Sequence, residues 1–172
     1  ACYPLGSVLT IAAAGSEMSN SCVITNEEGW YKKALDTDLA RPKFAIMNPE
    51  ITYTLPDYQT QCGCADIMMH TMERYFTNTT DVELIDRMSE GLLVAVREAT
   101  IRAVDKPDDY EARATLMWAG SLSHNGLTGT GRQSDFASHK IEHELGGMFD
   151  VATVQVYVPS GEAGRVMYIR QT

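Results

Sequence analysis

The sequence predicts a chain in two parts, an α/β segment followed by an all-helical segment, and three observations lead to this fold class. Short runs of β-branched and apolar residues, separated by turns that contain Gly or Asn, occur before Pro56. Between residues 57 and 150, apolar residues instead recur at spacings of three and four, which is the helical period. The strands come first and do not alternate with helices, so the first part holds no complete βαβ unit. We therefore expect two domains that meet at Pro56.

The α/β part, residues 1–56, contains three candidate strands. We expect a buried strand at residues 7–14, a second strand at 21–25 and a third at 43–48, and an extended segment at 51–55. Three strands are too few to close a sheet alone, and the chain enters the first of them without an initiator Met. We therefore expect this part to be the C-terminal remnant of a larger α/β domain.

The helical part, residues 57–152, is expected to hold four helices. Gly63 is a candidate break in the first helix, and Gly146 and Gly147 are typical of a helix end. The expected helices cover about 57–76, 82–105, 109–126 and 135–146.

Composition narrows the class of protein. The chain has 172 residues, 44% of them hydrophobic and 22% charged, and a net charge of −9. This acidic balance argues against a nucleic-acid binder, which would present a basic face, and no apolar run has the length of a membrane span. No secretion signal opens the chain, and we expect Cys2, Cys22, Cys62 and Cys64 to be free thiols in a reducing cytoplasm.

Two segments carry most of the histidines. Asp66 and His70 are four residues apart, and so are His139 and His143, which places each pair on one face of a helix. A carboxylate and two or three imidazoles from neighbouring helices can hold Fe²⁺ or Zn²⁺. Spacing alone leaves a second interpretation open, since such pairs are often solvated or buried without a ligand. We interpret the fourth histidine, His124, as a helix-end or loop residue.

The second segment also permits a hydrolase. His139-Lys-Ile-Glu142-His143 fits the inverted zinc-peptidase motif, with Glu142 as the general base. That hypothesis leaves Asp66 and His70 without a role. A third hypothesis is a metal-binding fragment without catalytic activity.

Weaker signals lie in the α/β part. Gly15 and Ser16 form a turn of small residues that would let the backbone approach a ligand, and Ser16 could donate to a phosphate or ribose. Lys32 and Lys33 follow the next turn, where they are either a solvated pair or a phosphate contact.

The order of several segments resembles the iron-containing alcohol dehydrogenases, in the branch of the butanol dehydrogenases and aldehyde reductases. The resemblance covers about residues 5–152, and the segments that carry it are 9–17, 53–56, 65–70, 109–114, 125–126 and 138–145. It implies a Rossmann-like nucleotide-binding domain, an all-helical domain, and a metal in the cleft between them. The implied cofactors are Fe²⁺ or Zn²⁺ and NAD or NADP.

The resemblance also implies roles for individual residues. Asp66, His70 and His139 match metal ligands, and His143 matches a residue beside the metal that is a candidate for the proton relay. The positions that match the lining of the nucleotide site are Thr10, Gly15, Ser16, Lys32 and Leu55. The implied reaction is hydride transfer between NAD(P) and a primary aliphatic alcohol or aldehyde, such as butanol or butanal, in a homodimer.

The chain departs from the resemblance near its end. The family places its last ligand, a His followed by Gly, fourteen residues after the position of His139, where this chain has Thr153. Codons for His-Gly-Ala-Gly read one base out of frame give Thr-Val-Gln-Val, which is the sequence of residues 153–156. We therefore interpret residues 153–172 as an out-of-frame tail, with a divergent C-terminus as the alternative.

Overall fold

The computed structural model describes residues 3–134 and 136–150. Cys2 and the expected tail at 153–172 lie outside the described residues. Strands precede helices along the chain, as the sequence predicted, and the change comes at Pro56, just before α1.

The strands form two small pairs. Strand β1 (Gly6–Val8) is parallel to β4 (Phe44–Ile46), and β2 (Ser21–Asn26) forms an antiparallel hairpin with β3 (Tyr31–Asp36). In the hairpin, Ser21 is opposite Asp36 and Asn26 is opposite Tyr31. The strands predicted at 21–25 and 43–48 are present as β2 and β4. The sequence did not predict β3.

Two strand predictions were wrong. The strand expected at 7–14 ends at Val8, because its partner β4 is equally short and the chain then bends to pack Ala12 against the first helix. The segment expected to be extended at 51–55 begins with a 3-10 helix, Pro49–Thr52. Asn48 caps that turn at the backbone N–H of Glu50, and Thr52 Oγ1 donates to the carbonyl of Pro49 over 2.7 Å. A second 3-10 helix covers Asp38–Ala40.

Four α-helices follow within the part of the chain that the structure describes, as expected. Asp109 caps α3, because its side chain accepts a hydrogen bond from the N–H of Ala112. The helices are α1 (Asp57–Tyr75), α2 (Glu83–Asp105), α3 (Tyr110–His124) and α4 (Ala137–Phe149), with a 3-10 helix at Leu127–Gly129.

Two glycines that were expected to interrupt or end helices instead allow close packing. Helix α1 continues through Gly63, where an added Cβ would lie 2.1 Å from the carbonyl oxygen of Ala12. Helix α4 continues through Gly147, where a Cβ would lie 2.5 Å from the carbonyl oxygen of Trp30. The missing side chains therefore let both helices approach the α/β part at backbone distance.

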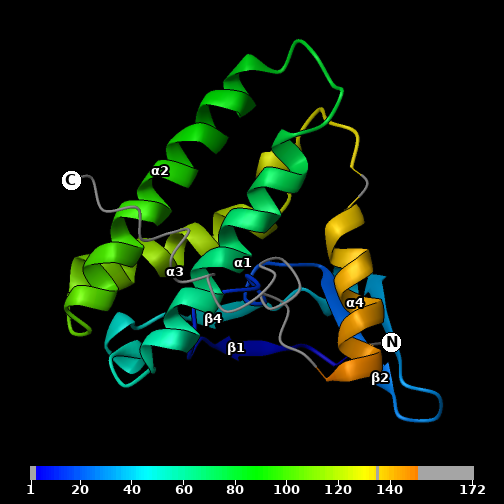
Figure 1. Ribbon diagram of the computed structural model, residues 1–172, viewed down its shortest axis with the longest axis horizontal. Helices are drawn as coiled ribbons and strands as arrows, with labels where there is room; N and C mark the ends of the chain where they lie inside the picture. The colour runs from blue at the N-terminus through cyan, green and yellow to red at the C-terminus, as the bar shows by residue number, and fades with distance from the viewer. Residues whose placement is uncertain (1–2, 135, 151–172) are drawn as a thin grey trace.

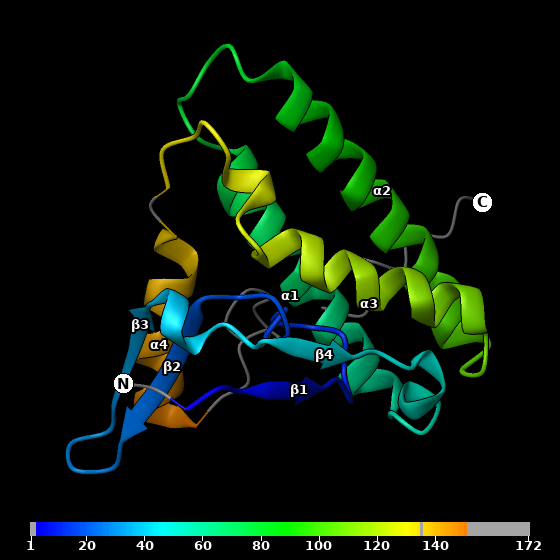
Figure 2. The same ribbon diagram turned by 180° about the vertical axis from the view of Figure 1, so that it is seen from behind.

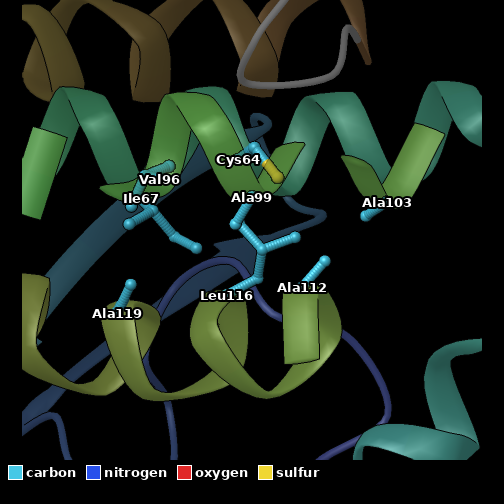
Figure 3. Packing of buried hydrophobic residues seen from close by; sticks show 8 residues of the cluster. All are labelled: Cys64, Ile67, Val96, Ala99, Ala103, Ala112, Leu116 and Ala119. Carbon is cyan, nitrogen blue, oxygen red and sulfur yellow. The ribbon is translucent and has the colours of Figure 1, made fainter. Parts of the chain in front are cut away.

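Helices α1, α2 and α3 pack around one hydrophobic core. Small side chains make up much of it, so the helices approach closely, and Ile67 and Leu116 fill the space between them (Figure 3). Both are almost fully buried, which stabilises the fold by about 1.5–3 kcal/mol for each side chain. The core residues are Cys64, Ile67, Val96, Ala99, Ala103, Ala112, Leu116 and Ala119.

Helix α4 stands apart from this core. It runs beside the β2–β3 hairpin, while α1 and α3 cover the β1–β4 pair (Figures 1 and 2). The first residues of α4 also lie beside the C-terminal half of α1, so a site that uses both helices faces the hairpin. Among the described residues, no helix combines the length and the apolar character that crossing a membrane requires.

Candidate metal centre

The predicted ligands Asp66, His70 and His139 come together. Helix α1 presents Asp66 and His70 on one face, and the first turn of α4 brings His139 to them. One ligand atom from each lies within 4.8 Å of the others, and all three residues are buried. Asp66 Oδ2 is 3.9 Å from His70 Nδ1, and Asp66 Oδ1 is 3.5 Å from His139 Nε2. The carboxylate therefore lies between the two imidazoles.

The chemistry of this cluster fits a divalent metal ion. Nδ1 of His70 is buried and has no hydrogen-bond partner among the described residues, which is costly without a ligand. Burial, followed by the nearby His124, His139 and Arg74, holds the pKa of His70 well below its ordinary value, so the ring keeps a free electron pair at neutral pH. Two imidazoles and one carboxylate suit Fe²⁺ or Zn²⁺.

Glu73 supports the cluster from α1, although the sequence analysis did not single it out. Its Oε1 accepts a hydrogen bond from the backbone N–H of Ser138 over 2.6 Å, and its Oε2 accepts one from Nδ1 of His139. Helix α4 has no side-chain cap of its own at Phe136, so Glu73 caps it from another helix. The same carboxylate directs Nε2 of His139 toward Asp66. Its position three residues after His70 was the signal that could have found it.

The carboxylates of Asp66 and Glu73 favour protonation of the His139 ring, which would have to lose a proton to bind a metal ion. Burial opposes protonation of the ring, but hydrogen bonds to Asp66 and Glu73 outweigh it and raise the pKa of His139 to about 9. Glu73 responds in the opposite direction: burial would raise its pKa, but the hydrogen bond from His139 lowers it. A metal ion therefore has to displace the proton that Asp66 and Glu73 hold on this ring.

Arg74 holds the imidazole of His124 beside that of His70. Its Nη1 donates to the carbonyls of His70 and Ser123 over 2.9 and 2.7 Å, and its Nη2 lies 3.1 Å from Nδ1 of His124. The guanidinium also lies over the ring of Phe136, 4.5 Å from its centroid. His124 is the last residue of α3, as expected, but its ring centroid is only 4.0 Å from that of His70. The prediction that placed it at a helix end therefore missed its contact with the site.

One cavity of about 750 Å³ joins the cluster to the hairpin. Of the predicted nucleotide residues, Ser16 and Lys32 line it. Leu55 lines a separate small cavity beside Cys64, and the structure places Thr10 and Gly15 in neither of these two cavities. The residues that line the large cavity are Ala14, Ser16, Ser19, Asn20, Ser21, Cys22, Val23, Lys32, Ala34, Asp36, Asp66, His70, Arg74, His124, Ser134, Phe136, His139, Lys140, Glu142 and His143.

Glu142 is held by the hairpin. Nζ of Lys32 donates to Oε1 of Glu142 over 2.7 Å, and Oε2 of Glu142 lies 3.6 Å from Nε2 of His143. A peptidase of the His-x-x-Glu-His type needs this glutamate as its general base, but here it is neutralised by a lysine. The geometry therefore gives the hydrolase hypothesis no support.

Family models match most of the chain. The C-terminal model of the Fe-containing alcohol dehydrogenase family matches residues 60–157, and the iron-containing alcohol dehydrogenase model matches residues 1–49. The first match covers both helices of the metal cluster, and its end falls inside the segment 153–172.

Individual relatives agree with these models. NADH-dependent butanol dehydrogenase B of Clostridium acetobutylicum is 49% identical over 149 residues, which cover 86% of this chain and 38% of that protein. The NADPH-dependent aldehyde reductase YqhD of Escherichia coli is 39% identical over 145 residues, which cover 84% of this chain and 38% of that protein. The chain thus spans well under half the length of these relatives.

A solved structure shows the same arrangement. The crystal structure of NADH-dependent butanol dehydrogenase A from Thermotoga maritima superposes with a TM-score of 0.86 at 38% identity, covering 89% of this chain and 38% of that one. The predicted fold class, the end of a Rossmann-like domain followed by part of a helical domain, is therefore confirmed. The chain belongs to the iron-containing alcohol dehydrogenase family, in the branch that holds the butanol dehydrogenases and aldehyde reductases.

Proposed function

We propose that this protein is a metal-dependent alcohol dehydrogenase and aldehyde reductase that transfers a hydride between NAD or NADP and a primary aliphatic alcohol or aldehyde, such as butanol or butanal. The observation that carries the proposal is the buried cluster of Asp66, His70 and His139, which opens into the same cavity as Ser16 and Lys32. The cavity thus has a metal-binding wall and a wall that would hold the nucleotide. Hydride transfer needs these two sites side by side.

Asp66, His70 and His139 would hold Fe²⁺ or Zn²⁺. When bound, the ion supplies Lewis-acid chemistry that polarises the oxygen of the substrate. Asp66 compensates part of the positive charge, and Glu73 keeps His139 oriented with Nε2 toward the site. The protein thus prepares a fixed electrostatic environment before substrate arrives.

His143 is proposed as the group that handles the proton. It follows His139 by one helical turn, and its side chain lines the cavity. Burial lowers the pKa of His143, and Lys32 and His139 lower it further against the opposing effect of Glu142, so the ring is neutral at pH 7. A neutral imidazole accepts the hydroxyl proton during alcohol oxidation and returns it during aldehyde reduction. NAD(P)⁺ and alcohol thereby give NAD(P)H, aldehyde and one proton.

The nucleotide is proposed to lie along the hairpin wall. Lys32 projects from β3 and Ser16 from the turn after Ala14, and both meet the cavity. An ammonium group and a hydroxyl suit phosphate and ribose oxygens. Thr10, Gly15 and Leu55 remain proposed nucleotide residues on the strength of the resemblance alone.

The activity assay is oxidation of NADH and of NADPH by butanal, with the protein loaded anaerobically with Fe²⁺ or Zn²⁺. We expect turnover that depends on the metal, that is lost in His139→Ala, and that falls at least about a hundredfold in His143→Ala, the low end of general acid–base contributions. A metal-loaded protein that oxidises neither nucleotide, or turnover that His139→Ala leaves unchanged, would refute the proposal.

Further parts of the proposal concern organisation. We propose residues 1–56 as the nucleotide-binding part, 57–152 as the metal-binding part and 153–172 as an out-of-frame tail, and the coding DNA tests the last of these directly. A cytoplasmic homodimer is proposed for the whole protein. Free thiols at Cys22, Cys62 and Cys64 support the reducing compartment. Sedimentation analysis tests the dimer, and cell fractionation tests the location.

A further inference from the structure

Phe136, the residue before helix α4, has a backbone conformation that bulky residues rarely adopt. Its φ and ψ angles are 50° and 40°, in the left-handed region, where the Cβ of a side chain crowds the backbone. A strained conformation of this kind persists only where the surrounding contacts outweigh its cost, and such residues concentrate at functional sites. The contacts of the Phe136 side chain therefore bear on the role of this turn.

The ring of Phe136 packs beside the metal cluster. Its centroid lies 4.5 Å from the guanidinium carbon of Arg74 and 5.2 Å from the ring centroid of His139. The ring centroids of His124 and His70 lie 6.0 and 6.2 Å away. These separations are typical of packed aromatic rings and of a cation over an aromatic face. One side chain thus packs against imidazoles that come from α1, α3 and α4.

Helix α4 depends on contacts of this kind at its first turn. Among the described residues, none of α4 belongs to the hydrophobic core that α1, α2 and α3 share. Near its C-terminal end, α4 meets the hairpin, where Gly147 lets the two backbones approach. At the first turn, which carries His139, Glu73 accepts hydrogen bonds from α1, and Phe136 adds its ring. The position of His139 therefore rests on a polar contact and on an aromatic one.

We propose that Phe136 is a positioning residue of the metal centre, whose ring fixes the first turn of α4 and so keeps His139 beside the other two ligands. The inference rests on the proposed function, which places a divalent ion at these ligands. Phe136 is not a ligand itself, because its side chain has no nitrogen, oxygen or sulfur atom. A ligand that is already held in place binds a metal more tightly and releases it more slowly, so loss of the ring should weaken metal binding.

Two features of Phe136, the ring and the left-handed backbone, are separated by substitution. Phe136→Leu keeps an apolar side chain on the same backbone but removes the aromatic face that meets Arg74. Phe136→Gly removes the side chain and also relieves the backbone, since glycine adopts this conformation readily. Phe136→Tyr keeps the ring. If the ring positions His139, the first two variants should lose metal affinity and the third should retain it.

A general loss of stability has to be distinguished from a loss of positioning, and Val96→Ala is the control. Val96 is fully buried in the core and lies on α2, which contributes no residue to the metal cluster. Its truncation leaves a cavity and should lower the urea concentration at the midpoint of unfolding. Zinc affinity should not change, because the folded chain that remains has its ligands in place.

The test measures the zinc affinity of the full chain and its variants by calorimetry, and the rate of zinc release into an excess of chelator. We expect Phe136→Leu and Phe136→Gly to bind zinc about tenfold more weakly, the low end of the effect of residues that orient ligands, and to release it faster. We expect Phe136→Tyr and Val96→Ala to bind zinc as the unchanged chain does. Unchanged affinity in Phe136→Leu or Phe136→Gly, or an equal loss in Val96→Ala, would overturn the inference.

The result also separates this inference from the proposed function. Zinc affinity that responds to Phe136 in a chain that reduces no aldehyde would count against the proposed function alone. Absence of zinc binding by the unchanged chain would overturn both.

A second measurement needs neither metal nor substrate. An aromatic ring shifts the NMR signals of protons that lie close to it, so the imidazole signals of the zinc-free chain report their contact with Phe136. In Phe136→Leu, we expect the signals of His70, His124 and His139 to move more than those of His143, which makes no ring contact with Phe136 among the described residues. Unmoved signals of these three histidines would overturn the inference even if the chain binds zinc.

Discussion

Nζ of Lys32 lies 2.7 Å from Oε1 of Glu142 and joins the β2–β3 hairpin to helix α4 across 110 positions of sequence. The side chain of Glu142 is 1% exposed, whereas that of Lys32 is 22% exposed. The pair therefore fixes the position of α4, which carries His139, against the proposed nucleotide wall. Water can solvate the partly exposed Lys32 if Glu142 is removed, but it cannot solvate the buried Glu142 if Lys32 is removed.

This difference predicts unequal costs of substitution. Lys32→Met leaves a buried carboxylate without its cation and should lower the free energy of unfolding by about 3 kcal/mol. Glu142→Gln leaves a lysine that can turn toward water, and should cost about 1 kcal/mol. Urea unfolding of both variants measures the two costs. Equal costs, or a larger cost for Glu142→Gln, would contradict the assignment of Glu142 as the buried partner.

Glu73 should control metal affinity without touching the metal. In Glu73→Gln, the single amide oxygen can accept from the N–H of Ser138 or from the Nδ1–H of His139, but not from both as the two carboxylate oxygens do, so the ring loses its fixed orientation. We expect zinc affinity to fall by about 10- to 100-fold and the free energy of unfolding to fall by about 1 kcal/mol through the weakened cap. Calorimetric titration measures the first effect and urea unfolding the second. Glu144→Gln, at an exposed position of α4, is the control substitution of the same chemistry, and equal zinc affinity in both variants would refute the role of Glu73.

Two glycines in helices should respond to alanine with opposite signs. Gly63→Ala places a methyl group 2.1 Å from the carbonyl oxygen of Ala12, so the backbone must move, and the protein should lose about 1–3 kcal/mol of stability or more. Gly91 lies inside α2 with nothing within 4 Å of the added carbon, so Gly91→Ala should gain about 0.5–1 kcal/mol. Thermal or urea unfolding of both variants measures the two changes in stability. A neutral Gly63→Ala would mean that α1 does not approach the α/β part at backbone distance.

Metal binding should release protons near neutral pH. Burial opposes the charge on His139, but Asp66 and Glu73 raise its pKa to about 9, so the metal-free ring is protonated at pH 7. A metal needs the electron pair of Nε2, so binding at pH 7 should release about one proton, and affinity should rise with pH until about pH 9. Calorimetry in buffers of different ionisation enthalpy counts the protons. Binding without proton release at pH 7 would show that Asp66 and Glu73 do not hold this proton.

Part of the fold was predictable because its signals are local. The apolar period located all four helices, and the spacing of Asp66 with His70 placed two candidate ligands on one face of α1. Spacing placed His139 and His143 on one face of a second helix, and the resemblance selected His139 as the ligand, which the structure brings to the other two. The strand β3 was missed because its residues are mostly exposed and lack a clear alternation.

Other parts depend on contacts between distant segments, which a sequence pattern does not encode. Gly63 gives the sequence signature of a helix break, yet its role is a contact with Ala12, some fifty residues earlier in the chain. Glu73 and Arg74 look like ordinary charged residues of a helix surface. They become supports of the site because α4 and the end of α3 bring His139 and His124 to them.

The most direct test of the central claim is an anaerobic titration of the full chain with Fe²⁺ and with Zn²⁺, followed by calorimetry beside His139→Ala and His143→Ala. We expect one ion to bind per chain, binding to be lost in His139→Ala, and binding to persist in His143→Ala, because His143 lies outside the cluster of Asp66, His70 and His139. Absence of specific binding, or binding that is indifferent to His139, would show that these three residues do not form a metal site.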